Sequence, residues 1–219
     1  MPLRSPRALF AFDRRFRRRR RDLKIAGTDE AGRGPLAGPV VAAAVLFLPG
    51  AKIPGLNDSK KLSASRREKL FHAICAQAEV GLGIVDEIEI DRLNILQASR
   101  LAMKKAVLAL SRTPDLVLVD GRDILDLEIR QEALVRGDAR SASIAAASII
   151  AKVTRDAWMT RLDSLYPGYG FKRHKGYPTA DHRRRLLETG PSPVHRRSFA
   201  PVREAEKAFA PNPGGILVG

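Results

Sequence analysis

Residues 25–48 have the sequence IAGTDEAGRGPLAGPVVAAAVLFL, in which two apolar runs flank a glycine-rich turn. The runs, from about residue 24 to 29 and from about residue 38 to 48, predict two neighbouring buried strands. Asp29 and Glu30 lie where the first strand meets the turn. A carboxylate among small apolar residues is costly without a partner, and a divalent cation is a suitable one. The stretch therefore predicts a sheet whose edge carries acids.

The rest of the chain alternates helical and extended patterns. Helices are expected over about residues 63–77, 91–110 and 142–165, and strands over about residues 79–86, 116–119 and 133–135. Strands in succession, followed by strands that alternate with helices, predict an α/β fold with a mixed sheet. Beyond residue 165 the chain becomes basic, and Thr179 is expected to cap a helix that Gly190 ends.

These patterns divide the chain into four parts. We expect a disordered, arginine-rich extension over residues 1–22, because it has too little apolar surface to fold. An α/β domain is expected over residues 23–165, a helical basic C-terminal domain over 166–203 and a flexible tail over 204–219. Whether the extension is a transit peptide or an over-extended start stays open.

The net charge of +15 is concentrated in two places. Residues 1–22 hold nine arginines against two acids, and residues 171–203 hold nine lysines or arginines against two acids. Such patches suit a polyanion, usually nucleic acid, although a merely solvated surface is the alternative. The single Cys75 excludes an internal disulfide, and no apolar run is long enough to span a membrane. We therefore expect a cytoplasmic protein, a monomer without a membrane partner.

Three aspartates follow or precede buried segments. Asp29 ends the first strand, Asp120 ends the run LVLV, and Asp138 precedes a long apolar helix. Strand ends in an open α/β sheet converge on one edge, where sites form. Taken singly, Asp138 is explained as a helix cap and Asp120 as part of a turn. Together with Glu30 they would repel one another, and two Mg²⁺ or Mn²⁺ ions would remove that repulsion.

An all-oxygen site of this kind suits two-metal hydrolysis of a phosphodiester. Neighbouring residues of a strand point to opposite faces, so Asp29 is expected to bridge the ions while Glu30 reaches round from the turn. The histidines are not expected to be ligands, because His174, His182 and His195 have no zinc-site spacing.

Seven blocks, in this order, carry a resemblance to a known family: DEAGRGPLAGPV, LNDSKKLS, ILQASRLAMKKAV, VLVDG, GDARSASIAAASIIAKVTRD, YGFKRHKGYPTADH and HRRSFAPV. From Lys24 to Val202 the chain resembles ribonuclease HII, the type 2 ribonucleases H. The resemblance implies a ribonuclease H-like fold, with a mixed five-stranded sheet flanked by helices and a small helical C-terminal domain.

The resemblance also implies an activity and its partners. It implies a metal-dependent endoribonuclease that hydrolyses the RNA strand of RNA–DNA hybrids and incises 5′ of single ribonucleotides in duplex DNA. Two Mn²⁺ or Mg²⁺ ions would be used, and the products would carry 3′-hydroxyl and 5′-phosphate ends. Whether a sliding clamp binds either tail of the chain stays open.

Site residues are carried over position by position. Asp29, Glu30, Asp120 and Asp138 match the four acids of the family. The loop of Gly32, Arg33 and Gly34 matches the element that senses the 2′-hydroxyl, which distinguishes RNA from DNA. Tyr177 matches a tyrosine that packs on the sugar, although an interdomain core aromatic is the alternative. Phosphate contacts, which position a duplex without reading its sequence, are expected from Lys60, Lys61, Lys172, Arg173, Lys175, Arg196 and Arg197.

Two other classes of protein remain as alternatives. A non-catalytic nucleic-acid-binding protein on a degenerate nuclease fold is disfavoured by the complete set of four acids. A nuclease of the same fold that acts on DNA junctions is disfavoured by the Gly32–Gly34 loop and Tyr177.

Overall fold

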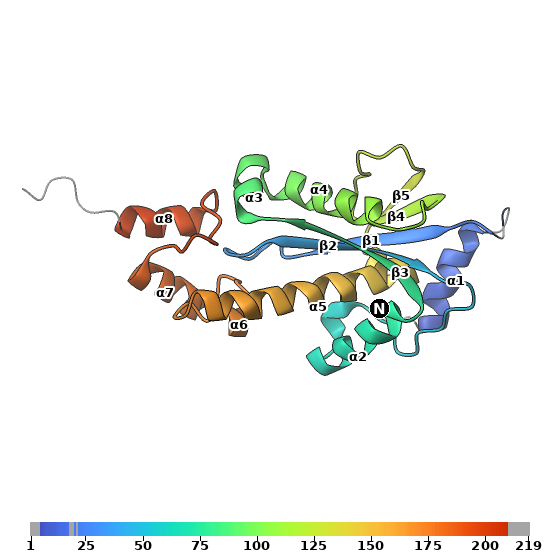
Figure 1. Cartoon of the computed structure of the whole chain (residues 1–219), viewed down its shortest axis with the longest axis horizontal. Helices are drawn as coiled ribbons and strands as arrows, with labels where there is room; N and C mark the ends of the chain where they lie inside the picture. The colour runs from blue at the N-terminus through green and yellow to red at the C-terminus, as the bar shows by residue number, and fades with distance from the viewer. Residues whose placement is uncertain (1–4, 18–19, 21, 210–219) are drawn as a thin grey trace, which may run out of the picture.

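The computed structural model describes residues 5–17, 20 and 22–209, and a five-stranded mixed sheet lies at the centre of this part of the chain (Figure 1). The strand order is β3-β2-β1-β4-β5. The antiparallel strands are β1 (Ile25–Ala31), β2 (Val40–Phe47) and β3 (Ala78–Val85). β4 (Leu116–Asp120) runs parallel to β1, and β5 (Gln131–Leu134) runs parallel to β4. The mixed sheet is the one predicted from the alternation of elements.

Two helices cover the two faces of the sheet (Figure 1). α4 (Ile95–Leu108) packs on one face and α5 (Ala142–Leu165) packs on the other. Small side chains let the helices approach closely, since alternate alanines of β2 are buried under each helix. Gly81 and Gly83 of β3 lie against the backbone of α4, where any side chain would overlap the carbonyls of Ala106 and Ala102.

One long helix predicted over residues 91–110 is instead two. α3 (Glu87–Leu93) and α4 meet at Asn94, which has a φ of 70°. Asparagine tolerates this left-handed region better than most residues, and its side chain accepts hydrogen bonds from the N–H groups of Leu96 and Gln97. The break arises because Asn94 ends one helix and caps the next.

The prediction of a disordered start is wrong for Pro6–Phe16, which form helix α1. Leu9 and Phe12 are buried against the core, and Phe16 packs beside them. These residues are three and four positions apart and share one helical face, which the many arginines of this segment obscured. Residues 1–4, 18–19 and 21 lie outside the described part of the chain.

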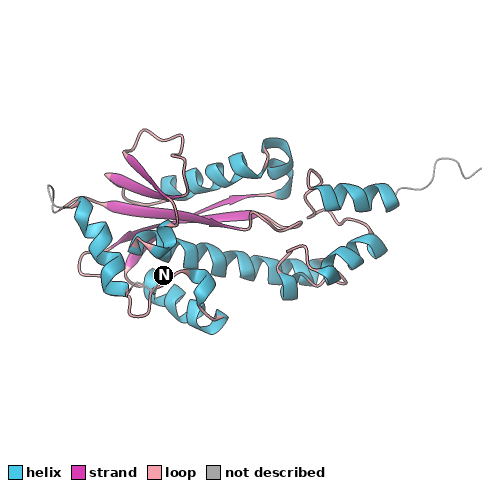
Figure 2. Cartoon of the chain, turned by 180° about the vertical axis from the view of Figure 1, so that it is seen from behind, coloured by secondary structure: helices cyan, strands magenta, loops and turns pink. Residues whose placement is uncertain are grey.

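Three further helices follow the end of α5: α6 (Phe171–His174), α7 (Ala180–Thr189) and α8 (Ala200–Phe209) (Figure 2). α8 includes residues 204–209, so the predicted flexible tail is wrong there, and residues 210–219 are not described. α2 (Ala64–Cys75) and the short helices η1 (Ser59–Lys61) and η2 (Gly137–Ala139) pack near α5. Within the described residues, no helix is long and apolar enough to cross a membrane.

Candidate active site

The sheet brings the predicted acids to one edge. β1 and β4 are adjacent and parallel, with Thr28 opposite Val119, so Asp29 and Asp120 follow at the same level. Asp138 lies in η2, just after β5, and the backbone N–H of the preceding Gly137 donates to Oδ1 of Asp120 at 2.6 Å. Three acids that are up to 109 positions apart in sequence thus become neighbours through strand pairing.

Asp29 and Glu30 point to opposite faces of β1, as the strand period requires. Gly27 lies against α5, so Asp29 belongs to the α5 face, whereas Ala26 packs with α4 on the face of Glu30. Both nevertheless line one cavity of about 360 Å³ together with Asp120. This is possible because β4 ends at Asp120 and leaves Glu30 without a neighbouring strand on that side.

Burial and mutual repulsion shift the titration of this cluster. Burial, followed by the charges of Glu30 and Asp120, raises the pKa of Asp29 well above its usual range. Burial and then the charge of Asp138 raise the pKa of Asp120, and burial and then Asp58 raise that of Asp138. The pKa of Glu30 is also raised by burial, although Arg33 opposes the shift. Ionising these four carboxyl groups therefore costs free energy, and a bound cation would offset that cost.

Two side-chain cations lie beside the acids. Nζ of Lys60 is 3.9 Å from Oδ2 of Asp138, and Nη1 of Arg33 is 3.4 Å from Oε1 of Glu30. As the side chains stand, no three acid, histidine or cysteine residues of the described chain are grouped to hold one ion. The donor set fits magnesium or manganese even so, because it consists of carboxylates only and burial raises the pKa of each acid, so a divalent cation would stabilise their ionised forms.

The Gly32–Gly34 loop rests on two buried arginines that the sequence did not single out for this role. Arg155 is 0% exposed and donates from Nε to the carbonyl of Pro39 (3.0 Å) and from Nη2 to that of Ala37 (3.2 Å). Its Nη1 donates to the carbonyl of Lys175 at 3.0 Å, which joins the loop to the C-terminal segment. Gly32 has a φ of 103°, and any side chain there would overlap the guanidinium of Arg155.

Arg196 is the second of these arginines, and its prediction as a phosphate contact is wrong. It is 0% exposed, and it donates to the carbonyls of Gly32 (2.7 Å), Arg33 (3.1 Å) and Gly38 (2.9 Å). The N–H groups of its guanidinium are directed to these backbone carbonyls and not to solvent. Burial lowers the pKa of Arg196 to about 9, so it stays charged at neutral pH.

The other predicted basic residues divide into two groups. Lys175 is half-buried, and its Nζ donates to the carbonyl of Asp156 and to Oγ1 of Thr160, so its amine is already engaged. The remaining five are exposed and accessible to a polyanion: Lys60, Lys61, Lys172, Arg173 and Arg197. Arg173 and Arg197 also pair with Asp181 and Glu206.

Tyr177 lies at the same cavity as the loop. Its side chain is 42% exposed, and its ring is the nearest group to the position that a side chain on Gly34 would take, at 3.6 Å. Nζ of Lys152 lies 5.9 Å from the ring centroid. The ring is exposed at the cavity that Asp29, Glu30 and Asp120 also line, and the alternative of an interdomain core aromatic does not describe it.

Three histidines form a buried network under Tyr177 that the sequence did not reveal. His182 Nδ1 is 2.9 Å from the carbonyl of Tyr177, and its Nε2 is 3.1 Å from Nε2 of His195. Since Nδ1 of His195 accepts from the N–H of Ser192, the His195 proton must be on Nε2 and points to His182. Burial lowers the pKa of His182 to about 4 and that of His195 to about 3, which keeps both rings neutral.

His174 completes this network. Its Nε2 lies 2.8 Å from the carbonyl of Tyr169, and its Nδ1 accepts from the N–H of Gly176. The rings of His174 and His182 are stacked, with centroids 4.3 Å apart. In the sequence, only His174 and His182 lie close to KGYP, and His195 follows His182 by 13 residues, so local spacing did not predict the network.

A mixed sheet with carboxylates at the ends of β1 and β4 is the arrangement that the resemblance to nucleases of the ribonuclease H type implies. The family model for ribonuclease HII matches residues 26–202. Ribonuclease HII of Geobacillus kaustophilus is 58% identical over 187 residues, which cover 84% of this chain and 71% of that protein.

Solved structures agree with this family. Ribonuclease H2 of Pyrococcus horikoshii superimposes with a TM-score of 0.74 at 30% identity, covering 87% of this chain and 100% of that one. Ribonuclease HII of Archaeoglobus fulgidus, solved in complex with PCNA, gives a TM-score of 0.65 at 30% identity, covering 76% and 87%.

The chain belongs to the ribonuclease HII family. It is a member of a family of metal-dependent hydrolases that cleave RNA endonucleolytically in RNA–DNA hybrids. The predicted family and the ribonuclease H-like fold are thus confirmed.

Proposed function

We propose that this protein hydrolyses the RNA strand of RNA–DNA hybrids and incises duplex DNA 5′ of single ribonucleotides, leaving 3′-hydroxyl and 5′-phosphate ends. One observation carries the proposal. The cavity that holds Asp29, Glu30 and Asp120 is also lined by the Gly32–Gly34 loop and Tyr177. The groups proposed for phosphodiester chemistry and those proposed for sugar recognition therefore line one cavity.

Asp29, Glu30, Asp120 and Asp138 are proposed to hold two divalent cations, Mn²⁺ or Mg²⁺. Such ions supply an activated water and stabilise the leaving oxygen in this type of hydrolysis. The acids must be deprotonated to bind them, and because burial raises the pKa of Asp29, Asp120 and Asp138, bound cations would offset the cost of ionising these carboxylates. Lys60, 3.9 Å from Asp138, is exposed enough to move away when the site is loaded.

Recognition of ribose is proposed for the loop and the tyrosine. Arg196 donates hydrogen bonds to the carbonyls of Gly32 and Arg33, and the guanidinium of Arg155 packs against Gly32, so the backbone of the Gly32–Gly34 loop is supported by both arginines. Backbone groups can bond a 2′-hydroxyl in any sequence context, which suits an enzyme that selects sugar and not base. Tyr177 then provides a flat surface for the neighbouring sugar.

Further proposals concern the remaining parts of the chain. Residues 23–165 form the catalytic unit, and residues 166–203 form a substrate-binding unit whose exposed cations, Lys172 among them, contact phosphates together with Lys60 and Lys61. The protein acts as a cytoplasmic monomer. A sliding clamp is proposed as a partner, supported by the complex that the Archaeoglobus fulgidus protein forms with PCNA.

A DNA duplex that carries one ribonucleotide tests the proposed function. The purified protein is incubated with this duplex in Mg²⁺ or Mn²⁺, beside an all-DNA duplex, an all-DNA junction and an RNA–DNA hybrid. Incision on the 5′ side of the ribonucleotide, with no cut in all-DNA substrates, is expected. Failure to cut the ribonucleotide duplex or the hybrid with either ion refutes the proposal, whereas cutting of the junction supports a DNA-junction nuclease.

A further inference from the structure

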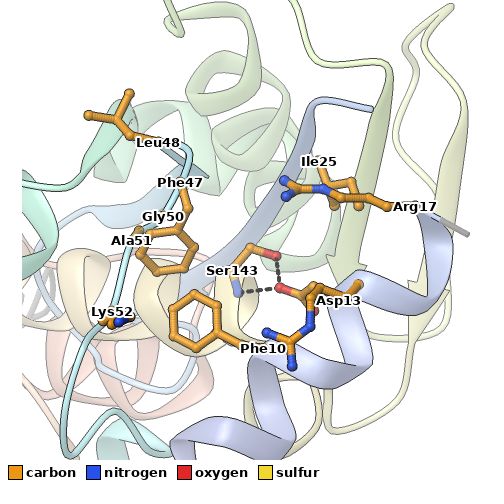
Figure 3. A pocket seen from close by; sticks show the side chains of 11 residues that line it. Phe10, Asp13, Arg17, Ile25, Phe47, Leu48, Gly50, Ala51, Lys52 and Ser143 are labelled. Atoms are coloured by element: carbon orange, nitrogen blue, oxygen red, sulfur yellow. Dashed lines mark hydrogen bonds between the residues drawn. The ribbon is translucent and has the colours of Figure 1, made fainter. Parts of the chain in front are cut away.

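Asp13 is a buried acid of α1, upstream of the residues that the family model matches. It is 8% exposed, and its Oδ2 accepts hydrogen bonds from the backbone N–H of Ser143 (2.9 Å) and from Oγ of Ser143 (3.0 Å) (Figure 3). Its Oδ1 has no hydrogen-bond partner among the described residues. An acid kept in so costly a position calls for a role beyond helix docking.

The partner of Asp13 stands at the first turn of α5. Ser141 caps this helix by accepting from the N–H of Ile144 at 3.3 Å, and its Oγ lies 3.0 Å from Oγ of Ser143. Because the Ser143 hydroxyl donates to Asp13, the Ser141 hydroxyl is the donor between the two serines. The negative charge of Asp13 also faces the positive end of the α5 dipole, which favours an acid over a neutral acceptor.

The hydrogen bonds continue from α5 to the carboxylate cluster. The N–H of Ser141 donates to the carbonyl of Gly137 at 2.8 Å, and the N–H of Gly137 donates to Oδ1 of Asp120 at 2.6 Å. Asp138 is the next residue of the same short helix. An unbroken path of hydrogen bonds and backbone therefore leads from Asp13 to two of the four acids.

The start of α5 is also clamped from the opposite side. Gly27 of β1 lies so close to Ser143 and Ile144 that any side chain on it would overlap their backbone. Gly27 is two residues before Asp29, on the same face of the strand. The first turn of α5 thus contacts both α1 and β1, and Asp138 precedes this helix in the chain.

We propose that Asp13 is a positioning residue that, from the N-terminal helix, fixes the first turn of α5 and so sets the spacing of the metal-binding carboxylates. The proposal rests on the proposed function, because it takes the four acids to be the metal site. It gives α1 a part in the active site without contact to substrate.

Three variants test this role. Asp13→Ala removes the acceptor, and Asp13→Asn keeps an acceptor for both Ser143 groups. Met103→Ala is the matched control, because it creates a cavity in the core on the far side of the sheet and lowers stability without touching α5. Mn²⁺ binding to the substrate-free protein is measured from the loss of the free-ion EPR signal, and kcat and KM are measured on the hybrid at saturating Mn²⁺.

We expect Asp13→Ala to weaken Mn²⁺ binding about tenfold, as is typical when a group that orients a ligand is lost. The KM for the hybrid should stay at the wild-type value, Asp13→Asn should recover most of the affinity, and Met103→Ala should bind Mn²⁺ normally. Wild-type affinity in Asp13→Ala, or an equal loss in Met103→Ala at a matched melting temperature, overturns the proposal.

Two provisions keep the test decisive. If Asp13→Ala does not fold, Ser143→Ala removes the side-chain hydrogen bond to Asp13 and the link to Ser141, and its Mn²⁺ affinity must fall for the proposal to stand. Failure of the proposed function is separate, because it appears as a wild-type protein that does not cut hybrid at all. A wild type that cuts hybrid, combined with unchanged Mn²⁺ binding in the variants, refutes the role of Asp13 alone.

Discussion

Nη2 of Arg196 lies 2.7 Å from the carbonyl oxygen of Gly32, although the two residues are 164 positions apart in the sequence. The same guanidinium also reaches the carbonyls of Arg33 and Gly38, so one side chain from the C-terminal segment holds the whole loop. Arg155 donates to the carbonyls of Ala37, Pro39 and Lys175, so the two buried arginines together satisfy backbone oxygens on both sides of this contact.

Replacement of Arg196 by lysine should damage both stability and recognition. An ammonium cannot reproduce the planar set of donors, so carbonyls of the loop lose their partners, and we expect a loss of about 3 kcal/mol in the free energy of unfolding. Urea denaturation measures this loss, and kcat/KM on the single-ribonucleotide duplex should fall with it. Arg130→Lys, at an exposed arginine outside the proposed substrate-binding unit, is the control, and an equal loss there would contradict the assignment.

Replacement of Asp120 by asparagine should abolish cleavage while the hybrid still binds. The variant keeps the size of the side chain but removes charge that the metal site needs, and we expect kcat to fall by at least about a thousandfold. Cleavage and fluorescence-anisotropy assays on the same labelled hybrid separate the two effects. Asp123→Asn, at a nearby exposed acid, should cut normally. Substantial activity in Asp120→Asn would exclude the four-acid site.

Replacement of Asp29 by asparagine should stabilise the metal-free protein. The pKa of Asp29 is raised in the folded state, so the ionised acid opposes folding at neutral pH and this penalty disappears as the pH falls to the ordinary aspartate value. We expect a gain of about 1 kcal/mol at pH 7 in EDTA. Thermal unfolding at pH 7 and pH 4 checks the sign, since the difference between the two proteins should shrink at the lower pH.

The contribution of Tyr177 to activity should come from its aromatic ring more than from its hydroxyl. Its exposed side chain makes no hydrogen bond through the hydroxyl within the described residues, so Tyr177→Phe should retain most of the activity. Tyr177→Ala removes the stacking surface and should cost about 1–3 kcal/mol in kcat/KM on the single-ribonucleotide duplex. If the alanine and phenylalanine variants are both as active as the wild type, Tyr177 takes no part in substrate recognition.

The histidine network should make the C-terminal segment sensitive to acid. His182 and His195 are neutral in the folded state, with pKa values of about 4 and about 3, and their contribution to stability is complete above their ordinary value of 6.5. It decreases as the pH falls from there toward 4 and 3, by up to about 1.4 kcal/mol per pH unit for each ring. Because the raised acids act in the opposite direction, the comparison is with His182→Gln, whose stability should decline less steeply from pH 6.5 to 4.

Some of the site could be read directly from neighbouring residues in the chain. Asp29 and Glu30 adjoin a buried run and a glycine-rich turn, and Asp120 ends a buried run. Their positions at the ends of buried strands therefore predicted them as site residues. The Gly32–Gly34 loop and Tyr177 were found because short motifs carry them. Residues whose partners are distant in the sequence carry no such local signal. Arg196 was therefore predicted as a surface cation, and Asp13 lies in an arginine-rich segment that was predicted to be disordered.

The sequence by itself determined the α/β alternation, the mixed sheet, the four acids and the family, because each depends on periodicity or on a compact motif. Tertiary structure alone decided which groups face inward. Only the packing of α1 on the core turned Asp13 toward Ser143, and only the approach of the C-terminal segment to the Gly32–Gly34 loop buried Arg196. Hydrogen bonds between segments more than a hundred residues apart depend on three-dimensional proximity, and local sequence carries no record of it.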